Sequence, residues 1–483
     1  MMDEAISEEV QTLCQRYQAL ALSENHTTLT VALSEEAPQG LLAALRFATG
    51  KRIHLEQWPA ARLELALHQR QRQVEPPAQA TAEYQLDTAS LDDDSDAPVV
   101  QFINQTLRIA IHRRASDVHF EPYQQRFRVR LRIDGVLQAS ASPPPELATR
   151  LSTRLKIMGQ LDIAERRLPQ DGQFSLWLDN ARYSMRIATL PTLHGEKVVL
   201  RILPSERQEL PLDRLGMSQA ALACYTAALA NPQGMILVTG PTGSGKTITL
   251  YSGLRQLNDT QSNLCSVEDP IEIPLFGVNQ TQVNIKTELS FSRVLRALLR
   301  QDPDVIMIGE IRDRETAEIA VKAAQTGHLV LSTLHTNSTG ETLTRLTHMG
   351  IPGYLIAACL KLVIAQRLVR RLCEHCRYPL NKPVHFPANL WPEPLTAWQA
   401  NGCEHCFGGY YGRIGVYELL TITPEVQTGL LENTSPRQLA DIACLQGHIT
   451  LLQAGLALVA KGVTSLEELY RVVDITTEGG EQS

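Results

Sequence analysis

The residues best suited to chemistry form a glycine-rich run that ends in Lys246 and Thr247. The apolar stretch 235–238 before the run predicts a buried strand, and a helical pattern begins at residue 248. In this context glycines let backbone N–H groups surround a polyphosphate, and the helix N-terminus adds the positive end of its dipole. Lys246 would reach the outer phosphates and the Thr247 hydroxyl would hold Mg²⁺, whereas the alternative is a plain glycine-rich turn. The run consists of Gly240, Pro241, Thr242, Gly243, Ser244, Gly245, Lys246 and Thr247.

Two carboxylates follow predicted strands of the same sheet. Glu268 comes directly after the strand expected at 263–267, and Glu310 closely follows the strand expected at 305–308. Ligands bind at the carboxyl edge of an open parallel sheet, so both groups are expected near the phosphates. Hydrolysis of a triphosphate needs an aligned water and Mg²⁺ on the outer oxygens, and we expect each carboxylate to hold one of these. The usual aspartate is absent after the second strand, which leaves the direct metal contact to Thr247 and water.

Histidines flank another expected strand, at 329–334. His335 follows that strand among threonine and asparagine residues, and it is placed to sense a γ-phosphate. His328 precedes the strand, where it either contacts the nucleotide or simply fills a bend. A lone histidine is more often structural than catalytic, so both interpretations of His328 remain open.

Two C-x-x-C pairs account for four of the nine cysteines: Cys373 with Cys376, and Cys403 with Cys406. Four thiolates at this spacing suit tetrahedral Zn²⁺, and a closed set of four leaves no open position for catalysis. The two pairs lie somewhat further apart than is usual, and reduced, unliganded thiols are the alternative. His375 and His405 lie inside the pairs and are expected to be bystanders. The other cysteines are assigned to packing: Cys14, Cys224, Cys265, Cys359 and Cys444.

The composition indicates a globular protein of two or three domains, with 483 residues, 43% hydrophobic and 20% charged. The acidic start of the chain predicts no signal peptide, and no apolar run reaches the length of a membrane span, so we expect a cytoplasmic protein. The alternative function is a nucleic-acid-dependent NTPase. A net charge of −7 and only 5% aromatic residues speak against it, because single-strand grooves combine basic and aromatic side chains.

Several expected domains follow one another along the chain. A small α/β docking unit spans 1–68, with helical spacing through Val10, Leu13, Tyr17 and Leu20, a strand at 28–32 and a helix near 41–45. The polar, proline-bearing stretch 69–97 predicts a flexible linker. An α+β domain at 98–205 has a hairpin at Asp134-Gly135 and alternating arginines, mostly attributed to a solvated sheet face.

The larger domain, 206–474, alternates strands and helices, which indicates an α/β fold with a parallel sheet covered by helices on both faces. It includes a zinc module at 371–410, preceded by a basic run at 367–371 that we interpret as a solvated helix end. A helical C-terminal bundle at 423–473 and a tail at 475–483 complete the chain.

Four motifs of the larger domain together resemble those of the secretion ATPase superfamily, and more narrowly the assembly ATPases of type IV pili and type II secretion. The α+β domain carries matching motifs, so the resemblance covers residues 98–474. The matching segments are 115–122, 132–136, 168–172, 195–201, 240–247, 266–272, 299–313 and 326–337.

The resemblance implies a RecA-like P-loop NTPase domain, a PAS-like α+β domain and a homohexameric ring that hydrolyses ATP. It implies that Glu310 is the catalytic glutamate and that Arg186 and Arg201 reach the γ-phosphate, so that hydrolysis moves rigid units. The ring would drive pilin or a secreted substrate through a polytopic platform protein, at the cytoplasmic face of the inner membrane and without nucleic acid. The zinc module fits assembly motors rather than retraction motors, whereas residues 1–68 are short for the family.

Overall fold

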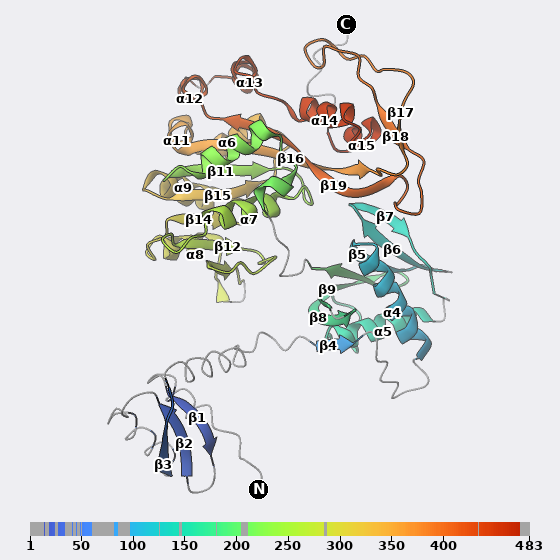
Figure 1. Cartoon of the computed structure of the whole chain (residues 1–483), viewed down its shortest axis with the longest axis vertical. Coiled ribbons are helices and arrows are strands. Elements are labelled where there is room, and N and C mark those ends of the chain that lie inside the picture. Colours follow the sequence, from blue (N-terminus) through green and yellow to red (C-terminus); the bar gives the residue numbers. More distant parts are fainter. Residues whose placement is uncertain are drawn as a thin grey trace. The chain divides into compact units, whose positions relative to one another are not determined.

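The computed structural model of the chain divides into two compact units, residues 1–81 and 82–483, and each is described by itself (Figure 1). The residues described are 14, 19–24, 28–33, 41, 45, 49, 51–59, 82–85, 97–124, 126–143, 147–179, 181–203, 211–284, 287–432 and 434–473.

The first unit contains a three-stranded sheet of β1 (Leu20–Glu24), β2 (Thr28–Leu33) and β3 (Arg52–Gln57), in that order. β1 and β2 pair antiparallel, and β2 and β3 pair parallel. Leu41 and Leu45 are helical and fully buried in the same small core, so the expected strand at 28–32 and helix near 41–45 are both present. Leu20 contradicts its expected place on a helix, because it begins strand β1; Val10, Leu13 and Tyr17 lie outside the described residues.

The second unit begins with a seven-stranded sheet in the order β4-β8-β9-β10-β5-β6-β7. Helices α4 and α5 contribute side chains to the core with one face of this sheet, and the Asp134-Gly135 turn joins β6 to β7 as expected. Strand β4 falls inside the stretch expected to be a flexible linker, and it pairs parallel with β8. The elements are α4 (Ala97–His112), β5 (Ala115–Pro122), β6 (Phe127–Ile133), β7 (Val136–Ala139), α5 (Ala148–Met158), β8 (Gln170–Leu178), β9 (Ala181–Thr192), β10 (Gly195–Ile202) and β4 (Ala82–Gln85).

The alternating arginines of β6 are bound rather than merely solvated. Glu121, only 4% exposed, accepts hydrogen bonds from Arg128 and Arg130 and forms an ion pair with Lys197 at 3.1 Å. These three cations hold the pKa of the Glu121 carboxyl at about 2, although burial alone would raise it. The charged face of the sheet is therefore an ordered ion-pair network.

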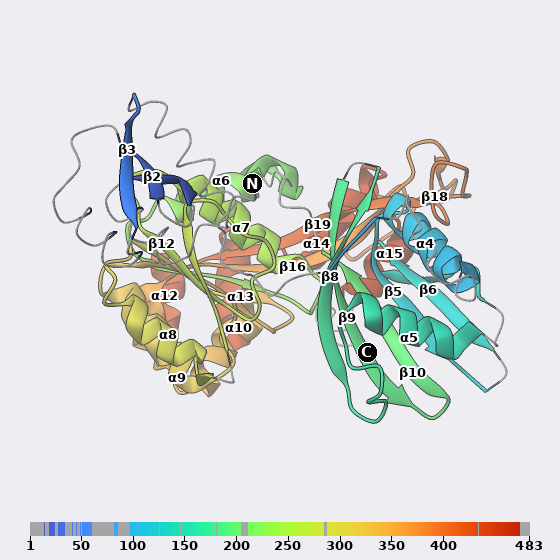
Figure 2. The ribbon, with the colours of Figure 1, turned by 90° about the horizontal axis from the view of Figure 1, so that it is seen from below.

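The larger domain contains a second seven-stranded sheet in the order β13-β12-β14-β15-β11-β16-β19, in which only β19 runs antiparallel to its neighbour. Successive residues of β11 contact opposite cores: Met235 and Leu237 pack with α8 to α13, and Ile236 and Val238 pack with α6 and α7. Figure 2 shows these helices on the two sides of the sheet. This arrangement confirms the α/β architecture expected from the sequence.

The bounds of the sheet strands and of the helices that cover them in the larger domain are as follows. They are η2 (Leu212–Leu215), α6 (Gln219–Leu229), β11 (Gly234–Thr239), α7 (Lys246–Leu257), β12 (Leu264–Glu268), β13 (Val278–Gln282), α8 (Phe291–Leu298), β14 (Val305–Ile308), α9 (Arg314–Gln325), β15 (Leu329–Leu334), α10 (Thr339–His348), α11 (Gly353–Cys359), β16 (Leu360–Leu372) and β19 (Tyr410–Thr421).

The basic run at 367–371 belongs to strand β16, which corrects the expectation of a solvated helix end. Arg367 is 7% exposed, and Arg370 forms an ion pair with buried Glu468 at 2.7 Å, whereas only Arg371 is open to solvent. Arg367 is buried and Arg370 is half-buried because they bind residues that are distant in the sequence, such as Asn337 and Glu468. A local sequence pattern does not reveal such partners.

Four helices follow β19, but they pack in two places rather than as the single bundle expected: α12 and α13 join the core that α8 to α11 form on one face of the sheet, and α14 and α15 join a separate core with β16 and the cysteine module. A short two-stranded sheet lies inside the cysteine module. These elements are α12 (Pro424–Leu431), α13 (Pro436–Leu445), α14 (Leu451–Ala460), α15 (Leu466–Val472), β17 (Arg377–Pro379) and β18 (Trp398–Ala400). In the described part of the chain, every helix is too short or too polar to span a bilayer.

Candidate active site

The loop between β11 and α7 has the backbone shape that the glycine-rich run predicts. Gly240, Gly243 and Gly245 have φ values of 146°, 81° and 89°, which side chains disfavour. A Cβ on Gly240 would lie 2.4 Å from the carbonyl oxygen of Gln366, so only glycine fits against the neighbouring strand. Around Gly243 a Cβ would meet nothing within 4 Å, which leaves that side of the loop open to a ligand.

Lys246 lies folded onto the loop that it follows. Its Nζ donates to the carbonyl oxygens of Gly240 at 2.8 Å and Pro241 at 3.1 Å. Burial lowers the pKa of Lys246 to about 8; the Glu310 carboxylate opposes this shift and the Arg367 guanidinium adds to it. The Ser244 hydroxyl is buried with no hydrogen-bond partner among the described residues. A buried donor without a partner and a destabilised cation both favour an anion at this loop.

Glu310 and His335 meet beside this loop. β15 lies between β14 and β11 in the sheet, so His335 stands between Glu310 and the glycine-rich loop. The His335 Nε2 atom is 3.3 Å from the Glu310 Oε2 atom, and Arg312 donates to the other carboxylate oxygen. Burial would raise the pKa of Glu310, but Arg312 and His335 hold it below its ordinary value. The carboxylate is therefore ionised and able to accept a proton or a hydrogen bond.

Glu268 stands at the end of β12, as expected, but it faces the protein interior. It is 2% exposed, and its Oε1 atom accepts hydrogen bonds from Ser266 at 2.6 Å and Gln280 at 3.0 Å. Its Oε2 atom accepts one from the buried Tyr251 hydroxyl. These contacts hold the Glu268 carboxylate in the protein interior, and Gly309, the residue after β14, lies close to the Glu268 backbone.

The other predicted residues, His328, Arg186 and Arg201, lie in different parts of the structure. The structure does not bring His328 to the site, because it precedes β15 at the opposite end from His335 and its Nδ1 is 2.9 Å from the Ala323 carbonyl oxygen. Arg186 reaches the segment after Glu268, where its Nη2 donates to the Ile271 carbonyl oxygen at 3.4 Å. Arg201 is bound to Asp117 at 3.0 Å.

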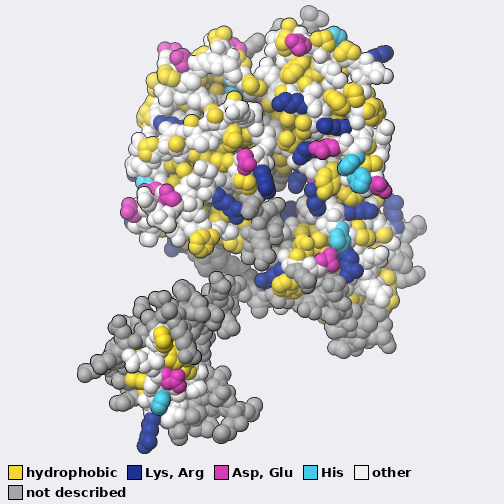
Figure 3. Space-filling model, in the orientation of Figure 1, with side chains coloured by type: hydrophobic (Ala, Val, Ile, Leu, Met, Phe, Trp, Pro, Cys, Tyr) yellow, Lys and Arg dark blue, Asp and Glu magenta, His cyan; other side chains and the backbone are white. Residues whose placement is uncertain are grey.

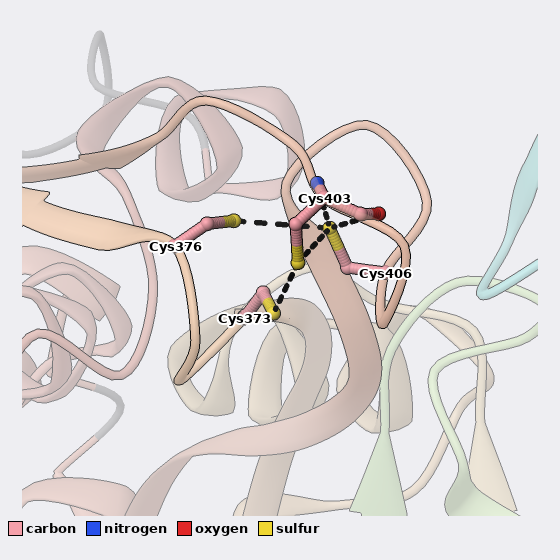
Figure 4. Close-up of side chains that lie close together, drawn as sticks. All are labelled: Cys373, Cys376, Cys403 and Cys406. Carbon is pink, nitrogen blue, oxygen red and sulfur yellow. Dashed lines mark hydrogen bonds between the residues drawn. The ribbon is translucent and has the colours of Figure 1, made fainter.

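The two C-x-x-C pairs come together in space (Figure 4). One ligand atom of each cysteine lies within 4.8 Å of all the others, and no histidine belongs to this group. The Sγ distances are 3.7 Å between Cys373 and Cys403, 3.8 Å between Cys376 and Cys406, and 3.7 Å between Cys403 and Cys406. The rings of His375 and His405 lie against each other, with centroids 4.4 Å apart. The module is a tetracysteine cluster that could bind a metal.

Two residues near the site escaped sequence reasoning. Arg312 lies two positions after Glu310, and this closeness in the sequence could have indicated that the two side chains pair. Arg367 stands far from the motifs along the chain, and only the pairing of β16 with β11 brings it to the loop.

Comparison with known families covers nearly the whole chain. Residues 92–471 match the family described as Type II/IV secretion system protein, and residues 3–77 match the MshEN domain. The second match lies where the sequence predicted a separate N-terminal unit.

Curated relatives are similar over most of their length. The Protein transport protein HofB homolog of Escherichia coli K12 is 50% identical over 96% of this chain and 98% of its own. The Type IV pilus assembly ATPase PilB of Pseudomonas aeruginosa PAO1 is 51% identical over 78% of this chain and 68% of its own. The Type II secretion system protein E of Klebsiella pneumoniae is 41% identical over 95% of both chains.

Solved structures share the fold of the second unit. The pilus retraction motor PilT with bound ADP has a TM-score of 0.53 at 28% identity, over 78% of this chain and 98% of that one. The Legionella pneumophila ATPase DotB has a TM-score of 0.56 at 22% identity, over 77% and 94%. Family match, curated relatives and fold agree with the resemblance read from the sequence, so the chain belongs to the Type II/IV secretion system protein family and, within it, to the ATPases of type IV pilus assembly and type II secretion.

Proposed function

We propose that the chain binds ATP with Mg²⁺ at residues 240–247 and hydrolyses it under the influence of Glu310. The observation that carries this proposal is the convergence of Lys246, His335 and Glu310 at the carboxyl ends of β11, β15 and β14. Thr247, on the first turn of α7, would hold the Mg²⁺, which supplies charge neutralisation on the outer phosphates. The Glu310 carboxylate would accept a hydrogen bond from the attacking water, and His335 would sense the terminal phosphate. We assign Glu268 an indirect role, orienting this site through its backbone.

Two neighbouring arginines of the α+β domain are a second feature that supports the binding of ATP, because they need a negative charge such as its γ-phosphate. Arg186 and Arg201 are direct cross-strand neighbours on β9 and β10, an arrangement that is unfavourable for two like charges. Asp117, opposite Arg201 on β5, neutralises only part of this charge. A γ-phosphate would supply the missing negative charge, and its loss on hydrolysis would release the domain.

We further propose that the protein works as a homohexamer at the cytoplasmic face of the inner membrane. Its partner would be the platform protein of a pilus or type II secretion machine, and association with the membrane would come through partners. Residues 1–68 would dock, and the stretch 69–97 would link them to the rest of the chain, except for strand β4, which belongs to the sheet of the α+β domain. Residues 98–205 would carry the arginines, and 206–474 would carry the ATPase and the cysteine module.

The donor set of the tetracysteine cluster favours Zn²⁺. A tetrahedron with Zn–S bonds of about 2.3 Å has edges of about 3.8 Å, which match the Sγ distances of 3.7, 3.8 and 3.7 Å. The backbone N–H of Cys403 also donates to the Cys406 sulfur at 3.1 Å, as expected for a thiolate. The zinc would hold β17 and β18 to the end of β16 and the start of β19.

A Cys403→Ser variant should therefore lose its zinc and melt at a lower temperature, by several degrees, in the larger domain. The expected loss follows because three remaining thiolates no longer close the tetrahedron. Metal content by atomic emission and a melting curve test this. A Cys444→Ser variant, outside the cluster, is the control, and equal zinc content in both variants would refute the site.

Nucleotide affinity should depend on the charge of Lys246. The pKa of Lys246 is about 8 in the nucleotide-free protein, and the phosphates favour its charged form, so binding above that pH takes up a proton. ATP affinity should stay level below about pH 7.5 and fall toward tenfold per unit above about pH 8.5. Titration with a fluorescent ATP analogue measures this, and a level affinity up to about pH 9.5 would contradict the assignment.

Hydrolysis by the purified chain tests the proposed function against a nucleic-acid-dependent NTPase. On the face shown in Figure 3, basic side chains are interspersed with acidic and hydrophobic ones. Magnesium-dependent ATP hydrolysis should be unchanged by single-stranded DNA and raised by a cytoplasmic fragment of the platform protein. Strong stimulation by DNA would remove the motor assignment.

A further inference from the structure

Arg367 is a buried cation beside the glycine-rich loop, on the face of the sheet opposite to α7. It is 7% exposed, and within the described residues no carboxylate lies within 4.0 Å of it; Glu418 and Glu341 act on it from further away. Its Nη1 atom would lie 3.2 Å from a Cβ on Gly240, so the guanidinium supports the first glycine of the loop. Burying a charged group away from an opposite charge costs free energy. A buried arginine that binds only carbonyl and amide oxygens therefore indicates a specific structural role.

The guanidinium joins three segments that are far apart in the sequence. Its Nη2 atom donates to the backbone oxygen of Asn337 at 2.9 Å and to its side-chain oxygen at 3.3 Å. Its Nη1 atom donates to the carbonyl oxygen of Gln366 at 3.1 Å, and its Nε atom donates to that of Val472 at 3.1 Å. Arg367 therefore fixes the segment after β15 relative to both β16 and the end of α15.

The segment that Arg367 holds carries His335. Thr336, the next residue, is tied to β11 because its N–H donates to the Thr239 hydroxyl at 2.9 Å. Asn337 follows and is held by Arg367 of β16, so the segment after β15 is fastened to β11 at Thr336 and to β16 at the next residue. His335 is itself half-exposed and meets Glu310 across 3.3 Å, so its position depends on this backbone anchoring.

We propose that Arg367 is a positioning residue for hydrolysis, which holds residues 335–337 against the glycine-rich loop and so keeps His335 within reach of Glu310. This inference rests on the proposed function, since it presumes that His335 and Glu310 act on the nucleotide. Arginine is required because its planar fork donates in three directions at once. A lysine would keep the charge but could not hold Asn337, Gln366 and Val472 together.

A double-mutant cycle separates positioning from general stability. Arg367→Lys should lower kcat about tenfold while changing KM for ATP less than about threefold, and His335→Ala should lower kcat by a similar factor. In the His335→Ala background, Arg367→Lys should cost less than about twofold, because the side chain it positions is already gone. Arg371→Lys, an exposed position on the same strand, is the control and should retain native turnover.

The outcomes distinguish two failures. If His335→Ala keeps native turnover, the role of His335 in the proposed function is wrong, and the inference falls with it. If His335→Ala is impaired but the two losses multiply, or Arg367→Lys is fully active, only the positioning role is wrong. If Arg367→Lys does not fold, the same double-mutant cycle is measured with Asn337→Ala, at an exposed position. This variant should lower kcat about threefold, and the effect should vanish in the His335→Ala background.

Discussion

A Glu310→Gln variant should bind ATP with Mg²⁺ about as tightly as the native chain and lose turnover by about 100- to 1,000-fold. The amide keeps the size of the side chain but neither accepts a proton nor presents a negative charge to the water. Because Glu310 pairs with Arg312 and His335 rather than with the loop backbone, nucleotide binding should survive the change.

Binding is measured by equilibrium titration and turnover by phosphate release. Glu318→Gln is the matched control, since that carboxylate lies on α9 and pairs with Arg314. Turnover near the native rate in Glu310→Gln would show that another carboxylate serves the reaction.

A Lys246→Met variant should lose most of its ATP affinity, by about tenfold to 100-fold, together with its turnover. Methionine replaces the buried stem but removes the ammonium group that would bind the outer phosphates. Since burial already disfavours the charged form of Lys246, as its pKa of about 8 shows, the variant should melt no lower than the native chain.

This combination of lost binding and retained stability separates a ligand role from a structural one. Lys322→Met, at an exposed position of α9, should leave both properties unchanged. Native ATP affinity in Lys246→Met would contradict the phosphate site.

Local patterns predicted the central part of the fold well. The apolar runs at 235–238, 305–308 and 329–334 are strands β11, β14 and β15, because short apolar runs between turn signals suit buried parallel strands. Their order in the sheet then placed Glu310 and His335 beside the loop, as their positions after strands indicated.

Residues whose environment depends on distant contacts could not be predicted in the same way. The run at 367–371 resembles a charged helix end, yet β16 pairs with β11 and β19 and thereby buries Arg367. Glu268 was expected near the phosphates because it follows a strand, but Tyr251 and Gln280 bind its carboxylate in the protein interior. His328 and His335 flank one strand and therefore lie at its opposite ends, and the parallel pairing of β15 with β11 puts His335 at the end that carries the glycine-rich loop.

The most direct test is a structure of the chain with Mg²⁺ and a non-hydrolysable ATP analogue. We predict that the Lys246 ammonium lies about 3 Å from an outer phosphate oxygen and that one water bridges the Glu310 carboxylate to the terminal phosphate. A terminal phosphate that lies away from Lys246, or a Glu310 carboxylate more than about 8 Å from it, would contradict the proposed hydrolysis site.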